Sequence, residues 1–324
     1  MRQISLQAFW GLFFLFLAGP ALAATADGYP GRPVRVVVPF AAGGTFDLVA
    51  RAVSLRLTEL WKQQVIVDNR PGGGTLIATE IVAKASPDGH TIYLSPNALA
   101  ANPALHKKLP YNAERDLAPA VLIAAQPMAL GTHPSSKART TKELIDFAKA
   151  QPGKLSYGTA GIGSGGHLAG EIFKSAAGID IAHISYKGGN VAMMDVVANN
   201  IPLVMTGLPN LLPLHKSGRI HVIGITSAKR SAIAEDIPAL GETVPGYDFK
   251  NWFGFIVPAG TPKAIIAKIN ASVNEVLNTG NTRQRLVSQG FDVLGGSTGE
   301  FADTIRKDTR IFADILRKAG VSAH

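Results

Sequence analysis

The chain has 324 residues, a formal net charge of +9 and no cysteine. The lack of cysteine excludes disulfides, zinc–thiolate sites, thiol catalysis and a lipid anchor carried on a thiol. Lysines and arginines are scattered rather than clustered, which gives no support to nucleic-acid binding, and the mild positive charge favours acidic small molecules.

The first two dozen residues have the pattern of a secretory signal peptide. Arg2 precedes the apolar run 8–18, and helix breakers separate that run from the small-residue site 21–23. The run is too short to span a bilayer comfortably, so a membrane anchor is the weaker alternative. We therefore predict a signal peptide over residues 1–23, cleavage near Ala23, and a soluble mature protein in the periplasm.

The mature chain opens with alternating strand and helix patterns. Apolar runs predict strands at 34–38, 65–67 and 91–94, separated by an amphipathic helix over 48–60 and a helix over 75–85. Strands that alternate with helices at this spacing are typical of parallel pairing in a doubly wound α/β sheet.

A second α/β block follows, and the last seventy residues add one strand and two long helices. Mature chains of about 300 residues exceed what one hydrophobic core usually organises, so we expect two lobes, 24–126 with 252–324 and 127–251. The further strands are expected at 128–131, 155–157, 181–185, 203–205, 222–225 and 254–257, and the helices at 141–150, 168–177, 191–198, 263–277 and 300–317.

Two glycine-rich segments each join a predicted strand to a predicted helix. The first glycine loop, 39–47, reads PFAAGGTFD, and the second glycine loop, 157–167, reads YGTAGIGSGGH. A strand that ends in glycines and turns into a helix leaves backbone N–H groups at the positive end of the helix dipole, where they favour an anion. Two such loops, over a hundred residues apart, predict an anionic ligand clamped between two lobes.

The chemistry of individual loop residues stays open at this point. Asp47 can cap its helix, and it can also hold the loop's shape or accept a hydrogen bond from the ligand; the capping and functional roles are compatible. Residues 161–166 match the dinucleotide fingerprint only formally, because the strand before them is poor and Asp180 precedes the next strand instead of ending it. Ser164 and His167 leave a secreted α/β enzyme, hydrolase-like, as the rival hypothesis. The histidines and carboxylates show no metal-binding spacing, so we expect no metal and no cofactor.

Together these segments resemble the Bug family of periplasmic solute receptors, the substrate-binding components of tripartite tricarboxylate transporters. The resemblance runs from residue 29 to the C-terminus. Its markers are VVPFAAGG at 37–44 with Asp47 and Arg51, DNRPG at 68–72, SPDGHT at 86–91, LPY at 109–111, 157–168, YKG at 186–188 and PAGTP at 258–262.

The resemblance implies a type II-like periplasmic-binding-protein fold of class α/β. In such a fold each lobe is a mainly parallel sheet flanked by helices, and the ligand lies in the cleft. It implies a monomeric receptor, not an enzyme, that passes a small carboxylate to an inner-membrane permease. The ligand is a di- or tricarboxylate or, if Phe46 offers a stacking surface, an aromatic acid. The implied contact residues are Phe40, Ala41, Ala42, Gly43, Gly44, Thr45, Phe46, Asp47, Ser95, Asn97, Thr159, Ala160, Gly163, Ser164, His167, Tyr186, Gly188, Gly189 and Asn190.

Overall fold

The computed structural model of the chain describes residues 28–318. The predicted signal peptide, residues 1–23, lies outside this range. Within it, none of the helices combines the length and the apolar character that crossing a bilayer would require.

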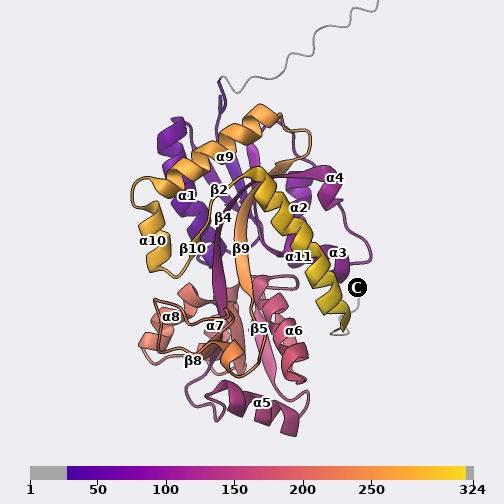
Figure 1. Ribbon diagram of the computed structural model, residues 1–324, viewed down its shortest axis with the longest axis vertical. Coiled ribbons are helices and arrows are strands. Elements are labelled where there is room, and N and C mark those ends of the chain that lie inside the picture. The colour runs from indigo at the N-terminus through magenta and orange to yellow at the C-terminus, as the bar shows by residue number, and fades with distance from the viewer. Residues whose placement is uncertain (1–27, 319–324) are drawn as a thin grey trace, which may run out of the picture.

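The upper half of the molecule in Figure 1 is built on three parallel strands in the order β2-β1-β3. The buried valines of β1 form the centre of its core, against which α1 and α9 pack. The elements of this half are β1 (Val34–Val38), α1 (Thr45–Trp61), β2 (Val65–Asn69), the 3-10 turn η1 (Gly73–Thr75), α2 (Leu76–Ala83), β3 (Thr91–Ser95), α3 (Ala98–Leu105), α4 (Ala113–Asp116), α9 (Lys263–Asn278), α10 (Thr282–Ser288), β10 (Asp292–Val293) and α11 (Thr298–Lys318).

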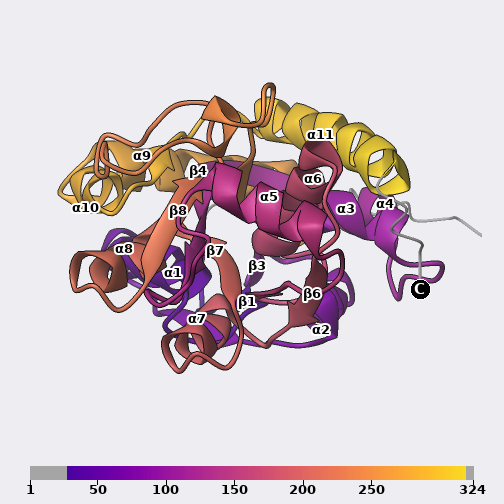
Figure 2. The ribbon, with the colours of Figure 1, turned by 90° about the horizontal axis from the view of Figure 1, so that it is seen from below.

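The lower half has its own sheet, in which β7, β5 and β6 are parallel neighbours. Successive side chains of a strand point to opposite faces. In β7, Leu203 and Met205 therefore join one hydrophobic cluster and Val204 joins another. Helices α5 and α6 cover the first side, and α7 and α8 cover the second (Figure 2). The elements are α5 (Thr141–Ala150), β5 (Ser156–Thr159), α6 (Gly165–Ala177), β6 (Ala182–Ser185), α7 (Gly189–Val197), β7 (Leu203–Gly207), α8 (Leu208–Lys216), β8 (His221–Ile225) and the 3-10 turn η2 (Leu240–Glu242).

Two long strands, β4 (Leu117–Thr132) and β9 (Lys250–Pro258), connect the halves. They pair antiparallel from Leu117 to Pro127 of β4, and β4 then changes partners at Met128 to join β7 and β8. The chain leaves the upper half along β4 and returns along β9, so the two strands must run in opposite directions (Figure 1). The predicted α/β class is therefore confirmed. The sheets are mixed rather than mainly parallel, because β9 pairs antiparallel with β3 in the upper half and β4 pairs antiparallel with β7 in the lower half.

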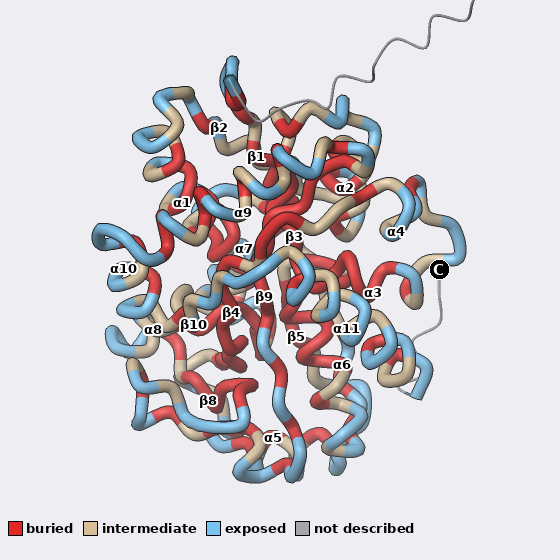
Figure 3. Tube along the Cα trace, turned by 45° about the horizontal axis from the view of Figure 1, so that its top comes forward, coloured by how far each residue is buried: buried red, intermediate tan, exposed pale blue. Residues whose placement is uncertain are grey.

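Two helices pack against both halves. Phe301 of α11 belongs to an upper cluster, whereas Phe312 near its C-terminal end packs on Phe249 in the lower half. Helix α3 likewise turns Ala101 and Leu105 into the lower core. Most residues of the central strands β4 and β9 are buried, and exposed segments lie mainly on the outside of the molecule (Figure 3).

The elements that the sequence analysis did not predict lack a clear periodicity. Helix α3 carries Pro103 and is buried on nearly all sides, and α8 carries Pro209 and Pro213. Strand β4 is far longer than the predicted 128–131 because its apolar run continues through Pro119 and Pro127. In each case tertiary burial outweighs the local signal of a proline.

Candidate ligand-binding site

A pocket lies between the halves, at the point where four helices begin. Helix α1 starts from the upper half, and α6, α7 and α8 start from the lower half, each directly after a strand or a glycine loop. The pocket is lined by Phe40, Ala41, Gly44, Thr45, Phe46, Met128, Ala160, Ser164, Gly165, Gly166, Gly188, Gly189, Asn190, Met205, Thr206, Gly207, Asn210 and Asn251.

Three of these four helices begin without a side-chain cap. The N-cap residues of α1, α7 and α8 are Gly44, Gly188 and Gly207, and none of them makes a side-chain cap hydrogen bond. Only α6 is capped, by Ser164. Backbone N–H groups and positive dipole ends from both halves therefore converge on one space, which is the arrangement that stabilises an anion.

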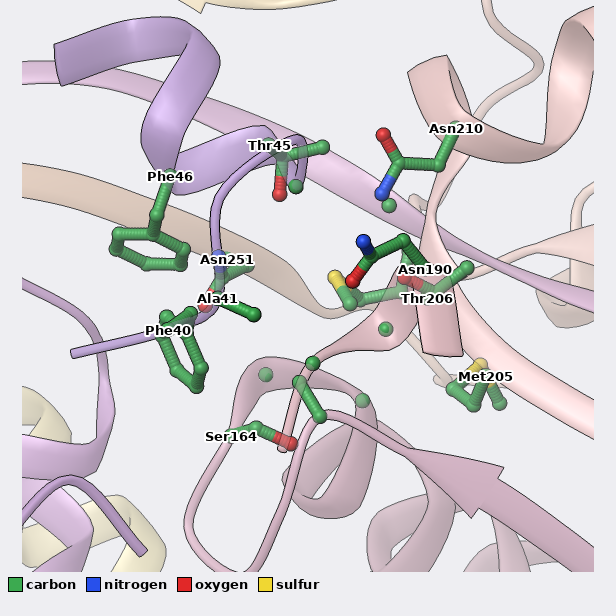
Figure 4. Close-up of a pocket in the computed structure, with 18 residues that line it drawn as sticks. Phe40, Ala41, Thr45, Phe46, Ser164, Asn190, Met205, Thr206, Asn210 and Asn251 are labelled. Carbon is green, nitrogen blue, oxygen red and sulfur yellow. The ribbon is translucent and has the colours of Figure 1, made fainter. Parts of the chain in front are cut away.

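The lining contains no Asp, Glu, Lys, Arg or His side chain. Polar groups come from Thr45, Ser164, Asn190 and Asn210, whose side chains point toward the space between them in Figure 4. An apolar wall faces them, formed by Phe40 and the ring of Phe46. The pocket thus offers a charged group fixed backbone dipoles and hydroxyl or amide groups rather than counter-ions.

Asp47 braces the first glycine loop from behind. Its Oδ2 accepts hydrogen bonds from the Gly43 N–H at 3.1 Å and from Arg51 Nε at 2.9 Å, and the side chain is buried. Burial alone raises the pKa of Asp47, but the hydrogen bonds from Arg51 and Gly43 outweigh it and hold the pKa below the ordinary value. The geometry favours the loop-holding role of Asp47, because it does not line the pocket.

The second glycine loop is held by hydroxyl and imidazole groups. Thr159 Oγ1 accepts from the Gly161 N–H at 3.1 Å and lies 2.7 Å from His183 Nε2. The Gly163 N–H donates to His167 Nδ1 at 3.1 Å, and the rings of His167 and His183 lie 4.4 Å apart. These side chains fix the loop that carries Ser164 into the pocket.

Both imidazoles are neutral at neutral pH. Burial and then the positive charge of Lys174 lower the pKa of His167 to about 4. Burial and then His167 lower the pKa of His183 to about 3. His167 and His183 therefore add no positive charge near the pocket at neutral pH. The positive potential there comes from the N-terminal ends of the helices.

The geometry does not favour the rival hypothesis of a Ser164–His167 nucleophile and base. Ser164 Oγ accepts from the His167 backbone N–H at 3.3 Å, as an N-cap does, and donates to Thr159 Oγ1 at 3.4 Å. The imidazole Nδ1 is already used by Gly163. Ser164 thus acts as a cap whose oxygen lines the pocket.

Contacts between the two halves close the pocket at its rim. The Ala41 N–H donates to the Lys187 carbonyl at 3.4 Å, and Asn190 Nδ2 donates to the Ala42 carbonyl at 3.3 Å. Both bonds join the first glycine loop to the start of α7. The two halves therefore meet directly across the site.

Ten of the predicted contact residues line the pocket, namely Phe40, Ala41, Gly44, Thr45, Phe46, Ala160, Ser164, Gly188, Gly189 and Asn190. Nine lie beside or behind it: Ala42, Gly43, Asp47, Ser95, Asn97, Thr159, Gly163, His167 and Tyr186. Asp47, Thr159 and His167 hold the glycine loops, and two others among the nine have a structural task of their own. Asn97 bonds to the β9 backbone, and the Tyr186 hydroxyl donates to Asp195 at 2.7 Å.

Eight lining residues were not named individually as contacts: Met128, Gly165, Gly166, Met205, Thr206, Gly207, Asn210 and Asn251. Two of them, Gly165 and Gly166, lie within the second glycine loop, which was predicted as a whole. A signal existed for the group at 205–210, because an apolar run followed by Gly207 and Pro209 is a helix start. Met128 and Asn251 carried none, since they reach the pocket only through the crossing of β4 and β9. Among residues 28–318 no cluster of three or more potential metal ligands occurs.

Comparison with known proteins gives the following matches. Residues 49–321 match the sequence model of the tripartite tricarboxylate transporter family receptor. Protein BugT of Bordetella pertussis is 31% identical over 323 residues, which cover 99% of each chain. The R. palustris protein Rpa4515, solved with adipate, is 32% identical with a TM-score of 0.88 over 91% of this chain and 100% of that one. MatC (Rpa3494) of Rhodopseudomonas palustris, solved with bound malate, is 27% identical with a TM-score of 0.85 over 89% of this chain and 100% of that one.

Proposed function

The chain belongs to the tripartite tricarboxylate transporter receptor family, and we propose that it captures a small carboxylate in the pocket between its two halves. The resemblance to the Bug family is thereby confirmed. The observation that carries the proposal is the convergence of four helix N-termini on a pocket without charged side chains. Such a site stabilises a carboxylate and offers nothing to hold a cation.

The ligand of this proposal is a dicarboxylate. One carboxylate faces the start of α1, where Gly44 and Thr45 present backbone N–H groups, and the other faces the start of α6 at Ser164 and Gly165. The relatives solved with adipate and with malate support this ligand class. The ring of Phe46 packs on Phe253, with centroids 4.4 Å apart, so it is largely committed to the core and favours an aliphatic chain over a stacked aromatic acid.

The proposed lobes are residues 24–126 with 252–324 and residues 127–251, connected by β4 and β9. The protein is exported to the periplasm after cleavage near Ala23, acts as a monomer without enzymatic activity, and delivers its ligand to an inner-membrane permease. Intact-mass measurement of exported material tests the cleavage, because a retained N-terminal segment would contradict it.

A thermal-shift screen tests the binding function. The mature chain is heated with a panel of aliphatic and aromatic dicarboxylates, with a neutral sugar and a cationic amine as controls. A ligand at 100 times its Kd stabilises the folded state by about 2.7 kcal/mol, which is easily seen as a rise in Tm. Stabilisation by the sugar or the amine but by none of the acids would overturn the proposal. Chemical conversion of a stabilising acid would instead revive an enzymatic function.

A further inference from the structure

Two side-chain amides lie opposite each other on the strands that connect the halves. Gln126 of β4 and Asn251 of β9 are register partners in the antiparallel ladder, so their side chains point to the same face. Gln126 is 0% exposed and Asn251 is 1% exposed. Both amides are therefore removed from solvent, and of the two only Asn251 lines the pocket.

These amides lack hydrogen-bond partners among the described residues. Neither Nε2 nor Oε1 of Gln126 has one, and Oδ1 of Asn251 has none. A buried polar atom left unpaired costs about 1–3 kcal/mol, so proteins rarely retain one without a use. The two amides point to a polar group that the chain itself does not supply.

Both amides lie against the helix ends that form the pocket. A Cβ placed on Gly165, in the first turn of α6, would overlap the amide group of Asn251. A Cβ placed on Gly207, the N-cap of α8, would lie 2.5 Å from Gln126 Nε2 and 2.8 Å from Thr45 Cγ2. Asn251 itself lines the pocket, among the residues labelled in Figure 4.

The backbone on both sides of Asn251 is fixed by a side chain from the upper half. Asn97 Oδ1 accepts from the Trp252 N–H at 2.8 Å, and Asn97 Nδ2 donates to the Lys250 carbonyl at 3.4 Å. Asn97 is itself buried. The amide of Asn251 is thus held in place before any ligand arrives, which suits a group that discriminates between ligands.

We propose that Asn251, supported by Gln126, accepts a hydrogen bond from a hydroxyl group of the bound carboxylate, so that the ligand is a hydroxydicarboxylic acid. This rests on the proposed carboxylate-binding function. The helix ends supply only donors, which the carboxylate oxygens satisfy. The unpaired Asn251 Oδ1 needs a donor, and a carboxylate has none at neutral pH.

A hydroxyl fits this position better than an ammonium group. The charge of an ammonium group would have no counter-ion here, because no acidic side chain lines the pocket. It would also meet the positive ends of four helices. A neutral donor avoids both costs, so the site selects 2-hydroxy over 2-amino acids of the same length.

Isothermal titration calorimetry on the mature chain tests this with pairs that differ by one hydroxyl. The probes are succinate against each enantiomer of malate, and glutarate against each enantiomer of 2-hydroxyglutarate. One hydroxylated enantiomer is expected to bind about tenfold more tightly than its unsubstituted partner, because one hydrogen bond to a buried acceptor is gained. Equal affinity within both pairs would overturn the inference and leave the carboxylate-binding function standing. Binding of none of these acids, nor of any acid in the wider panel, would overturn both.

Two variants assign the preference to the amides. Asn251→Leu and Gln126→Met keep the approximate side-chain volumes and remove the polar atoms, so each should reduce the hydroxyl preference, measured as the ratio of the affinities within each acid pair. Gln289→Met is the matched control, because Gln289 also buries an unpartnered oxygen but lies outside the pocket. It should keep the full preference. A preference that survives in both amide variants would show that other groups read the hydroxyl, and would overturn the assignment.

Discussion

The two glycine loops present backbone N–H groups to one pocket but are held in shape by different chemistry. The first loop depends on an ionised carboxylate, since Asp47 accepts from Gly43 and from Arg51. The second depends on uncharged groups, with Thr159, His167 and His183 bonded to its backbone or to one another. The comparison teaches that unlike side chains can hold the same arrangement of backbone N–H groups at a helix start. The bracing side chains then decide which mutation or change of pH disrupts each loop.

The loops differ also in the space that a Cβ atom would find at one of their glycines. A Cβ on Gly44 would meet only the Ala41 carbonyl at 3.6 Å, an ordinary contact. A Cβ on Gly166 would overlap the Met205 carbonyl of β7. The second loop is therefore packed against the sheet beneath it, and the first borders open pocket space.

The largest expected effect is that of Gly166→Ala. The added methyl group overlaps a backbone oxygen that cannot move without shifting β7, so the free energy of unfolding should fall by about 3 kcal/mol. Gly44→Ala, the matched change in the first loop, should cost about 1 kcal/mol or less. Urea denaturation of both variants measures the difference, and equal losses would contradict the packing contrast between the loops.

A second prediction concerns acid stability, which should be set by the second loop. The pKa values of His167 and His183 are lowered to about 4 and about 3, so between these values and the ordinary value near 6.5 the unfolded chain binds more protons than the folded one. Their contribution to stability is complete above pH 6.5. It is lost progressively as the pH falls from 6.5 toward 4.

Denaturation curves from pH 7 to pH 4 measure this loss, and a double variant provides the control. In His167→Asn with His183→Gln, the Asn oxygen replaces the Nδ1 acceptor for Gly163 and the Gln nitrogen replaces the contact with Thr159. The variant should show a flatter pH profile over this window. An unchanged slope would assign the acid sensitivity to other groups.

The smallest expected effect is that of Asp47→Asn in the first loop. Arg51 is more than half exposed, so its ion pair with Asp47 contributes little, and the main loss is the charge-assisted bond from Gly43. We expect a cost of about 1 kcal/mol at pH 7. Because the pKa of Asp47 lies below its ordinary value, the cost should stay constant down to pH 5 and shrink only below about pH 3.8, as the wild-type carboxyl is protonated. A cost that already changes between pH 7 and pH 5 would contradict this account.

Local sequence was sufficient to find the parts of the site that one segment builds alone. A strand followed by glycines and then a helix can be recognised within ten to fifteen residues, which is why 39–47, 157–167 and 186–190 were all predicted near the ligand. The same signal at 203–210 was missed because Pro213 interrupts the helix pattern after it. The parallel strands of both halves were also correctly placed, since each alternates with a helix.

A position within a glycine loop does not by itself decide whether a side chain faces the pocket. Asp47 and His167 both lie in the glycine loops, yet one turns back to Gly43 and Arg51 and the other to Gly163. A short polar residue can either bond to its own backbone or point outward, and the sequence is the same in both cases. The packing of the loop on its neighbours makes the choice.

What the sequence by itself determined is the class of the site, because backbone N–H groups at a helix start attract an anion wherever that helix is placed. What only the tertiary structure decided is the composition of the pocket. The antiparallel crossing of β4 and β9 brings Gln126 and Asn251, 125 positions apart in the chain, into register beneath the helix ends. No local pattern carries that pairing, since it arises from the return of the chain between the two halves.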